Sequence, residues 1–92
     1  MLTNGAGGPP DALAAREVYD RGCTPGEAQS CFNLGGLLVK GIGGEADPVR
    51  ARAVLTRGCD LGDGANCSRL AVLFDAGAGG PRDQAGARRL LE

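Results

Sequence analysis

An internal repeat of 36 residues is the feature that most constrains the fold of this chain. Cys23 and Cys31 recur 36 residues later as Cys59 and Cys67. When residues 11–46 are aligned with residues 47–82, 14 of the 36 positions are identical. A third copy begins at residue 83, so residues 83–92 form a partial repeat or a capping helix. A period of this length is typical of solenoids, in which each unit buries its apolar face against the next.

The apolar residues within each repeat have helical spacing. In the first copy the stripe of the first helix has positions i, i+3, i+4, i+7 and i+8, which are Ala15, Val18, Tyr19, Gly22 and Cys23. A Thr-Pro-Gly-Glu segment at residues 24–27 then interrupts the pattern. The stripe of the second helix contains Ala28, Cys31, Phe32, Gly35 and Leu38, widened by Leu34 and Leu37. Such a wide stripe predicts packing on two sides, and the small residue at Gly35 predicts close approach of a neighbouring helix.

Start and stop signals agree with two helices in each repeat. Asp47 followed by Pro48 predicts a capping aspartate and a proline at the first helical position, and Asp11 and Asp83 repeat the cap. Gly41 and Gly77 predict the end of each second helix. Residues 1–10 contain Asn-Gly, Gly-Gly and Pro-Pro pairs and are expected to be a flexible leader without a signal peptide. The predicted units are residues 11–46, 47–82 and 83–92.

The four cysteines are expected to form one disulfide in each repeat. Two cysteines eight residues apart lie about 12 Å apart along a continuous helix, which is too far for a disulfide. The chain reversal at residues 24–26 removes this obstacle. Of the three possible pairings, only Cys23–Cys31 with Cys59–Cys67 gives both repeats the same bridge.

Two other states of the cysteines are compatible with the sequence. Four thiolates suit a tetrahedral zinc ion, although structural zinc sites usually use pairs separated by two to four residues. Alternatively, in a reducing compartment the four side chains remain thiols and pack as small apolar groups.

Composition excludes several classes of function. A net charge of −1 with three aromatic side chains among 92 residues offers neither the basic surface nor the stacking platforms that nucleic acids need. The sequence contains no apolar stretch of membrane-spanning length. It also contains no histidine, which removes the Ser-His-Asp and Cys-His mechanisms and the commonest zinc ligand. We therefore expect neither a nucleic acid nor a membrane as partner, and no cofactor or metal.

The repeat resembles the cysteine-rich branch of the Sel-one-like repeats, which are relatives of the tetratricopeptide repeats and include the Helicobacter cysteine-rich proteins. The resemblance covers residues 11–92 and depends on Arg21-Gly22-Cys23, Cys31-Phe32-Asn33-Leu34-Gly35, Gly41-Ile42-Gly43-Gly44, Asp47, Ala51, residues 57–64 and Cys67. It implies an all-α fold, a right-handed α/α superhelix of about two and a quarter repeats, each stapled by one disulfide. The chain departs from the family at Gly44 and Gly80, where members often carry an apolar residue.

The resemblance implies two classes of function. The first is a non-catalytic scaffold that binds a protein or peptide on a concave face lined by the first helices, with self-association as a further expectation. The second is a β-lactamase-like hydrolase or penicillin-binding protein. The sequence has no Ser-x-x-Lys motif, because its only lysine is Lys40 and its only serines are Ser30 and Ser68.

Disulfides favour a periplasmic or secreted location.

Three arginines occupy the same position in the first helix of successive copies, namely Arg16, Arg52 and Arg88. A row of guanidinium groups can bind the carboxylates of an acidic or C-terminal peptide. The alternative is a solvated edge on which such arginines form ion pairs with Asp20 or Glu17.

Overall fold

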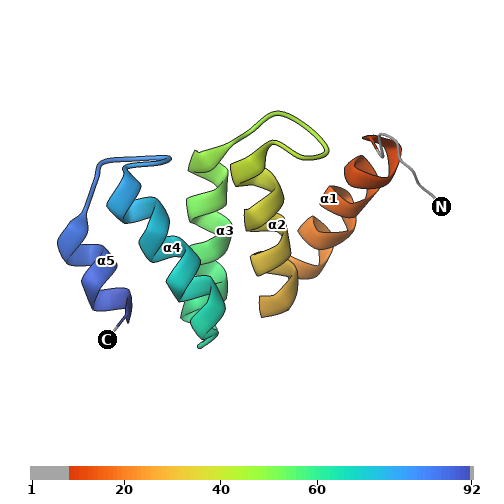
Figure 1. The fold of residues 1–92 in the computed structure, drawn as a ribbon. Helices are drawn as coiled ribbons and strands as arrows, with labels where there is room; N and C mark the ends of the chain where they lie inside the picture. Colours follow the sequence, from red (N-terminus) through yellow and green to blue (C-terminus); the bar gives the residue numbers. More distant parts are fainter. Residues whose placement is uncertain (1–8, 92) are drawn as a thin grey trace.

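A computed structural model describes residues 9–91, in which five helices follow one another along an elongated body of 42 × 24 × 17 Å. Figure 1 shows the row, with the N-terminal α1 at one end and the C-terminal α5 at the other. The helices are α1 (Pro9–Cys23), α2 (Ala28–Lys40), α3 (Pro48–Asp60), α4 (Gly64–Ala76) and α5 (Gln84–Leu91). This is the predicted order of two helical hairpins followed by a third first helix.

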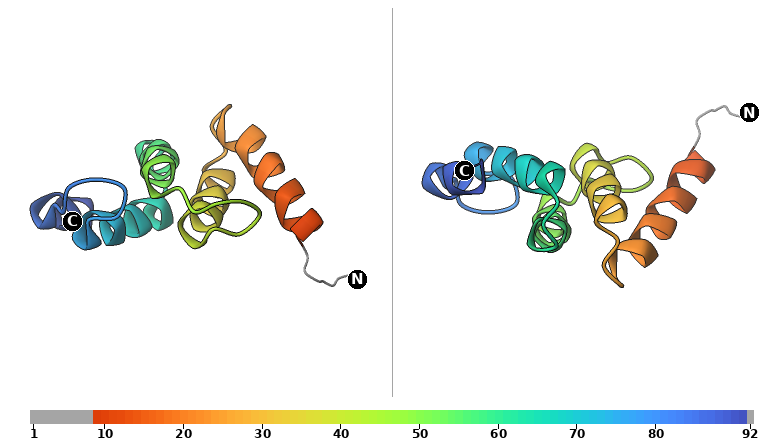
Figure 2. Two further views of the ribbon diagram at one scale, coloured as in Figure 1. Left: turned by 90° about the horizontal axis from the view of Figure 1, so that it is seen from above. Right: turned by 90° about the horizontal axis from the view of Figure 1, so that it is seen from below.

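Contacts between helices are local, as expected for a solenoid. Each helix packs on its neighbours in sequence, and the remaining contacts join α1 to α3 and α2 to α4. Seen from above, α3 lies on one side of the row and α2 and α4 lie on the other (Figure 2). No helix among residues 9–91 is long and apolar enough to cross a membrane.

The first helix begins earlier than predicted. Helix α1 starts at Pro9, so Asp11 lies in its first turn and does not cap it. Prolines fit there because the first N–H groups of a helix have no partner within the helix. The leader predicted for residues 1–8 lies outside the described residues.

Aspartates cap α3 and α5 as predicted, and an aspartate also caps α4. The Asp47 carboxylate accepts from the Arg50 N–H at 3.1 Å, and the Asp83 carboxylate accepts from the Gly86 N–H at 2.8 Å. Asp63 caps α4 by accepting from the Asn66 N–H at 3.1 Å. Helices α2 and α4 both end at glycines in the left-handed conformation, with φ of 72° at Gly41 and 71° at Gly77. This conformation favours glycine and lets the chain turn towards the next repeat.

The disulfide prediction is confirmed. Cys23 pairs with Cys31 and Cys59 pairs with Cys67, with Cα atoms 4.5 and 4.6 Å apart. Each bridge joins the end of the first helix of a hairpin to the first turn of the second. The core between the helices combines these sulfurs with buried leucine and alanine side chains, which are Leu34, Leu38, Ala51, Leu55, Leu70, Ala71, Leu73 and Ala87.

Gly35 and Val18 both lie on the predicted apolar stripes, but only Gly35 packs as expected. Gly35 confirms the expected close approach, because a Cβ atom built there would lie 2.6 Å from Leu55 Cδ2 on α3. Val18 was expected in the core and is instead 59% exposed. Its equivalent Val54 packs against the core. The difference arises because, within residues 9–91, α3 has α1 beside it whereas no helix precedes α1.

Candidate functional site

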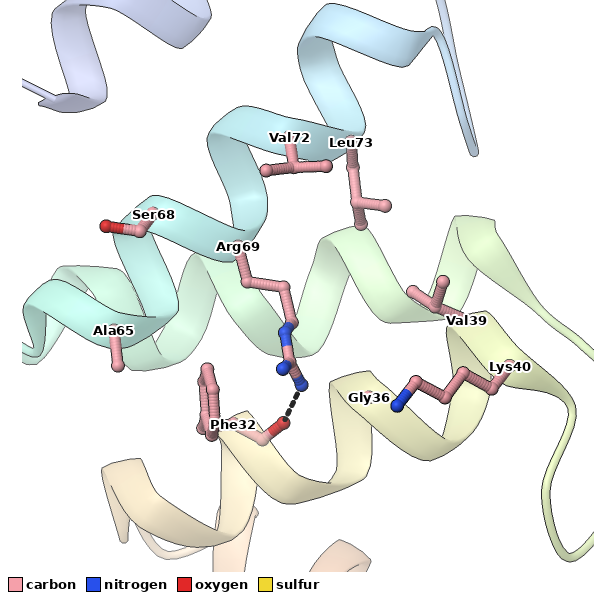
Figure 3. Close-up of a pocket in the computed structure, with 9 residues that line it drawn as sticks. All are labelled: Phe32, Gly36, Val39, Lys40, Ala65, Ser68, Arg69, Val72 and Leu73. Atoms are coloured by element: carbon pink, nitrogen blue, oxygen red, sulfur yellow. Dashed lines mark hydrogen bonds between the residues drawn. The ribbon is translucent and has the colours of Figure 1, made fainter.

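An open groove crosses the second helices of the two repeats. It has a volume of about 470 Å³ and lies between α2 and α4 (Figure 3). We call it the central groove, and it is lined by Phe32, Gly36, Val39, Lys40, Ala65, Ser68, Arg69, Val72 and Leu73. The binding surface predicted from the sequence lies on the first helices, whereas this groove lies on the second helix of each hairpin.

A cation–π pair forms a ridge in the central groove. The Arg69 guanidinium carbon lies 3.9 Å from the centre of the Phe32 ring, and Nη1 donates to the Phe32 carbonyl oxygen at 3.3 Å. Gly36 makes room for this guanidinium, since a Cβ atom there would collide with Nη1. Behind the ridge is a smaller hollow of about 280 Å³ that also includes Tyr19 and Ile42. Because its charge is stacked and hydrogen-bonded, Arg69 shapes the groove and ties α4 to α2.

The walls beside this ridge are apolar and open to solvent. Val72 on α4 is 64% exposed, and Val39 on α2 is exposed as well. Lys40, the last residue of α2, adds a positive charge at the same end of the groove (Figure 3). Contiguous exposed apolar side chains with polar groups at their rim are the kind of surface that binds other molecules.

A second groove continues from the first towards the C-terminal end. It has a volume of about 570 Å³, lies between α4 and α5, and shares Ser68 and Val72 with the central groove. We call it the end groove. Its other lining residues are Ala71, Asp75, Gln84, Ala87, Arg88 and Leu91.

The three arginines that occupy the same repeat position have two different environments. The Arg16 guanidinium donates to the carbonyl oxygens of Leu37, Ile42 and Glu45. The Arg52 guanidinium donates to the equivalent carbonyl oxygens of Leu73, Ala78 and Pro81, and lies 4.6 Å from the centre of the Phe74 ring. Both therefore hold the end of a second helix and the loop after it. Arg88 is exposed and lines the end groove.

This arrangement gives Gly44 and Gly80 a structural role. A Cβ atom at Gly44 would lie 2.9 Å from Arg16 Nη1, and one at Gly80 would lie 2.8 Å from Arg52 Nη1. Glycine at both positions gives the guanidinium groups space beside the loop.

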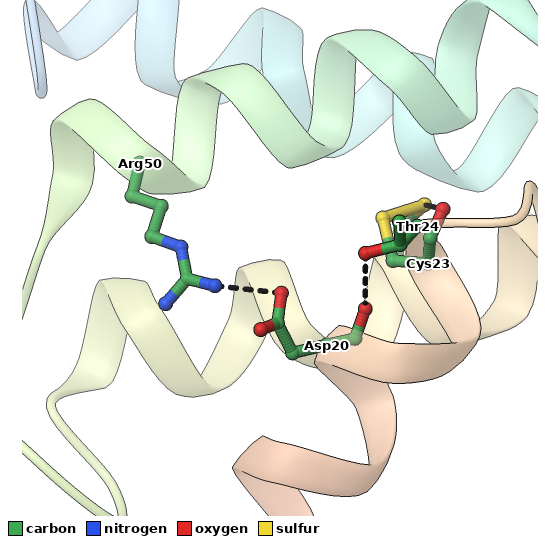
Figure 4. A network of polar contacts seen from close by, with 5 residues as sticks. Asp20, Cys23, Thr24 and Arg50 are labelled. Atoms are coloured by element: carbon green, nitrogen blue, oxygen red, sulfur yellow. Dashed lines mark hydrogen bonds and ion pairs between the residues drawn. A yellow bond between two sulfur atoms is a disulfide. The ribbon is translucent and has the colours of Figure 1, made fainter.

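The ion pairs expected for Arg16 on a solvated edge are not the ones formed. Asp20 binds Arg50 of α3 at 2.6 Å, while its backbone carbonyl accepts from Thr24 Oγ at 2.9 Å (Figure 4). Arg57 of α3 donates to the Thr24 carbonyl oxygen. These contacts link the first repeat to the second. Both partners of the ion pair are roughly half exposed, so its contribution to stability is at most about 1 kcal/mol.

A buried amide adds a further link between the repeats. Asn66 on α4 is fully buried, and its Nδ2 donates to the Ala28 carbonyl oxygen at 3.0 Å and to Asp63 Oδ2 at 2.6 Å.

Within residues 9–91 no cluster of three or more His, Cys, Asp or Glu side chains could hold a metal ion.

Sequence reasoning missed the central groove, although the repeat contains a signal for it. Its lining includes positions at which the two copies differ most in chemistry: Phe32 aligns with Ser68 and Gly36 aligns with Val72. Arg69 replaces the asparagine of the first copy. The identical positions of a repeat, by contrast, mainly report packing and turns.

The comparison with known proteins supports the same architecture. No protein-family model and no curated protein matches this chain. A solved structure of a protective antigen present in uropathogenic Escherichia coli strains, which displays a Sel-one-like repeat (SLR) fold, is similar over 85% of this chain with a TM-score of 0.81 and 27% sequence identity. This chain has the fold of a helical-repeat solenoid. It spans 17% of the length of that antigen, so the likeness concerns the repeats and not the whole protein.

Proposed function

We propose that this solenoid is a non-catalytic scaffold that binds a short segment of a partner protein in the central groove. The observation that carries the proposal is the exposure of Val39 and Val72 in one groove beside the Phe32–Arg69 ridge. Complete burial of a valine side chain contributes about 1.5 kcal/mol, so covering the exposed part of Val39 or Val72 contributes less than this for each. A segment with two or three apolar side chains therefore suits the groove.

Lys40 determines which charge we expect in that segment. It is the cation of the central groove whose charge is not stacked on an aromatic ring. An acidic side chain placed next to it would gain a charge-assisted hydrogen bond. We therefore expect the bound segment to combine apolar residues with an aspartate or glutamate.

We further propose that the protein works in the periplasm or as a secreted protein, and that its repeats belong to the cysteine-rich branch of the Sel-one-like repeats. Two disulfides in a small domain suit an oxidising compartment. The repeated Arg-Gly-Cys motif at residues 21–23 and 57–59 supports the subtype. Arg16 and Arg52 already use their donors within the chain, so we assign ligand binding on the first helices to Arg88 alone.

A peptide-display selection on the full chain tests the scaffold proposal. The affinity of selected peptides is then measured for the wild type, Val39→Lys, Lys40→Gln and the control Val18→Lys. Val18 is an exposed valine on α1 that lines none of the grooves described. We expect Val39→Lys to weaken binding about tenfold and Lys40→Gln to weaken binding of the acidic peptides only. Equal affinity for Val39→Lys and Val18→Lys would contradict the proposal.

The hydrolase alternative is tested separately. Ser30 Oγ donates to Glu27 Oε1 at 3.0 Å, and Ser68 lies on the open surface between the grooves. We expect concentrated protein to hydrolyse a chromogenic cephalosporin no faster than an inactive protein of the same size. Turnover that depends on Ser68 would replace the scaffold proposal.

A further inference from the structure

The central groove contains two cations that no carboxylate of residues 9–91 neutralises. Lys40 and Arg69 line it, and its other lining residues include no aspartate or glutamate. The ion pair within residues 9–91 joins Arg50 to Asp20, so neither cation of the groove is paired in the described part of the chain. Two unpaired positive charges beside apolar walls attract an anion, because walls of low dielectric focus their field.

Both cations act on the same part of α2. The Arg69 guanidinium lies over Gly36, where a Cβ atom would collide with Nη1. Lys40 follows Gly36 by about one helical turn, on the same face of the helix. Figure 3 shows the amino group of Lys40 directed back towards Gly36. The groove above this turn of α2 therefore lies between a guanidinium and an ammonium group.

Arg69 also keeps hydrogen-bond donors that the described chain does not use. The Arg52 guanidinium stacks on Phe74 and donates from Nε and Nη2 to three carbonyl oxygens. Arg69 stacks on Phe32 at 3.9 Å, and its hydrogen bond to a described residue is the one from Nη1 to the Phe32 carbonyl oxygen. A guanidinium has five N–H donors. Arg69 is thus held in place by stacking while most of its donors remain available to a ligand.

We propose that the side-chain carboxylate of an aspartate or glutamate in the bound segment bridges Arg69 and Lys40. The carboxylate accepts from the unused N–H groups of Arg69 and from Lys40 Nζ in charge-assisted hydrogen bonds. The Phe32 ring fixes the plane of the guanidinium before the ligand arrives. The inference rests on the proposed function, because it specifies one contact of the segment that the central groove binds.

The place of Arg69 in the groove favours a carboxylate from within the segment over one at a chain end. Along α4 the lining continues on both sides of Arg69, with Ala65 before it and Val72 after it. Helices α2 and α4 each have packed helices on both sides, so this part of the groove lies inside the row. A segment that follows the groove passes Arg69 and continues, and the group that reaches Arg69 is a side chain.

Val72 determines which residue stands beside the acidic one. It follows Arg69 by three residues, which is about 4.5 Å along α4, and it is exposed. Successive residues of an extended segment advance about 3.3 Å. In an extended segment, the apolar residue that covers Val72 therefore stands one or two positions from the aspartate or glutamate.

Peptides selected by display on the full disulfide-bonded chain provide the probes. Each acidic peptide is synthesised with a free and with an amidated C-terminus, and again with its acidic residue replaced by the corresponding amide, Gln or Asn. Fluorescence anisotropy measures the affinity of every form for the wild type, Arg69→Gln, Arg69→Lys and the control Arg21→Gln. Arg21 is an exposed arginine on α1 that lines none of the three hollows. Circular dichroism checks that each variant folds.

We expect the amide form to bind the wild type and Arg21→Gln at least about tenfold more weakly than the acidic form. In Arg69→Gln this difference should fall below about threefold. It should also shrink in Arg69→Lys, because lysine keeps the charge but loses the planar fork and the stack. If Arg69 only tied α4 to α2, its replacement would weaken both forms equally. An unchanged ratio between the two forms in the folded Arg69 variants therefore overturns the proposal.

The same measurements separate failure of the carboxylate contact from failure of the scaffold. If no peptide is selected, or if selected peptides bind Val39→Lys as tightly as Val18→Lys, the scaffold proposal fails and the contact fails with it. If peptides bind the central groove and the wild type holds the acidic and amide forms equally, only the carboxylate contact is wrong. Loss of wild-type binding on amidation of the C-terminus also overturns the contact, because the carboxylate then belongs to a chain end.

Discussion

Asn66 on α4 donates its side-chain Nδ2 to the backbone carbonyl of Ala28, the first residue of α2, at 3.0 Å. The same Nδ2 donates to Asp63 Oδ2 at 2.6 Å, and the amide packs so tightly on Gly58 of α3 that a Cβ atom there would collide with it. One buried side chain therefore joins α4 to α2 and fits against α3. Contacts of this kind keep the second repeat in register with the first.

Replacing this amide is expected to destabilise the fold more than replacing the exposed amide of Asn33 in α2. Asn66→Ala removes two buried hydrogen bonds and should lower the free energy of unfolding by about 1 to 3 kcal/mol. Asn33→Ala, which loses one exposed contact with Gln29, should lower it by less than about 0.5 kcal/mol. Urea unfolding measures both values. Equal losses would show that the Asn66 link does not contribute to stability.

The arginine position gives a matched pair of variants. Arg52→Gln breaks hydrogen bonds to three carbonyl groups and the contact with Phe74, so we expect its free energy of unfolding to fall by about 1 to 3 kcal/mol. Arg88→Gln, at the same repeat position, should leave the melting temperature unchanged. Thermal unfolding followed by circular dichroism compares them. A stable Arg52→Gln variant would return Arg52 to the set of candidate ligand-binding residues.

Close helix packing at Gly35 is tested by adding a single methyl group. Gly35→Ala places a Cβ against Leu55 and should cost about 1 to 3 kcal/mol in the free energy of unfolding, although alanine favours helix more than glycine does. Gly64→Ala at the start of α4 meets no atom within 4 Å and should be neutral or slightly stabilising. If both variants are equally stable, α2 and α3 are not packed as described.

The disulfides should contribute a large share of the stability of so small a core. Each closes a loop of about nine residues, which corresponds to about 2.5 kcal/mol on the chain-entropy model. The double variant Cys59→Ala with Cys67→Ala should therefore unfold at a lower urea concentration than the wild type. Adding a reductant should destabilise the wild type further than it destabilises the variant, because the wild type has two bridges to lose. A reductant without effect on either protein would contradict this account.

The repeat made most of the fold predictable. Identical glycines and aspartates at fixed positions predicted the turns and caps, as at Gly41 and Asp47, because these residues act through local backbone geometry. The cysteine spacing predicted the bridges because only a chain reversal brings residues eight apart within bonding distance. Val18 was predicted wrongly because burial depends on what lies beside a helix, which the residue spacing within that helix does not contain.

The candidate site was less predictable, because it depends on contacts between distant residues. Arg16 and Arg52 looked like ligand-binding residues in the sequence, and their acceptors are backbone carbonyl groups that have no sequence signature. The Phe32–Arg69 stack joins residues 37 positions apart at places where the two copies differ. Identical positions in a repeat alignment indicate shared packing. The central groove is instead lined partly at positions where the two copies differ.

The central claim, a solenoid whose hairpins are each stapled by a disulfide in an oxidising compartment, is tested most directly by peptide mapping. Protein from its native compartment is alkylated without reduction, digested on the carboxyl side of glutamate and the amino side of aspartate, and analysed by mass spectrometry. Cleavage at Glu27 and at Asp60 or Asp63 separates the cysteines of each pair. The account predicts peptides crosslinked as Cys23–Cys31 and Cys59–Cys67. Four alkylated thiols, or crosslinks between the two repeats, would contradict it.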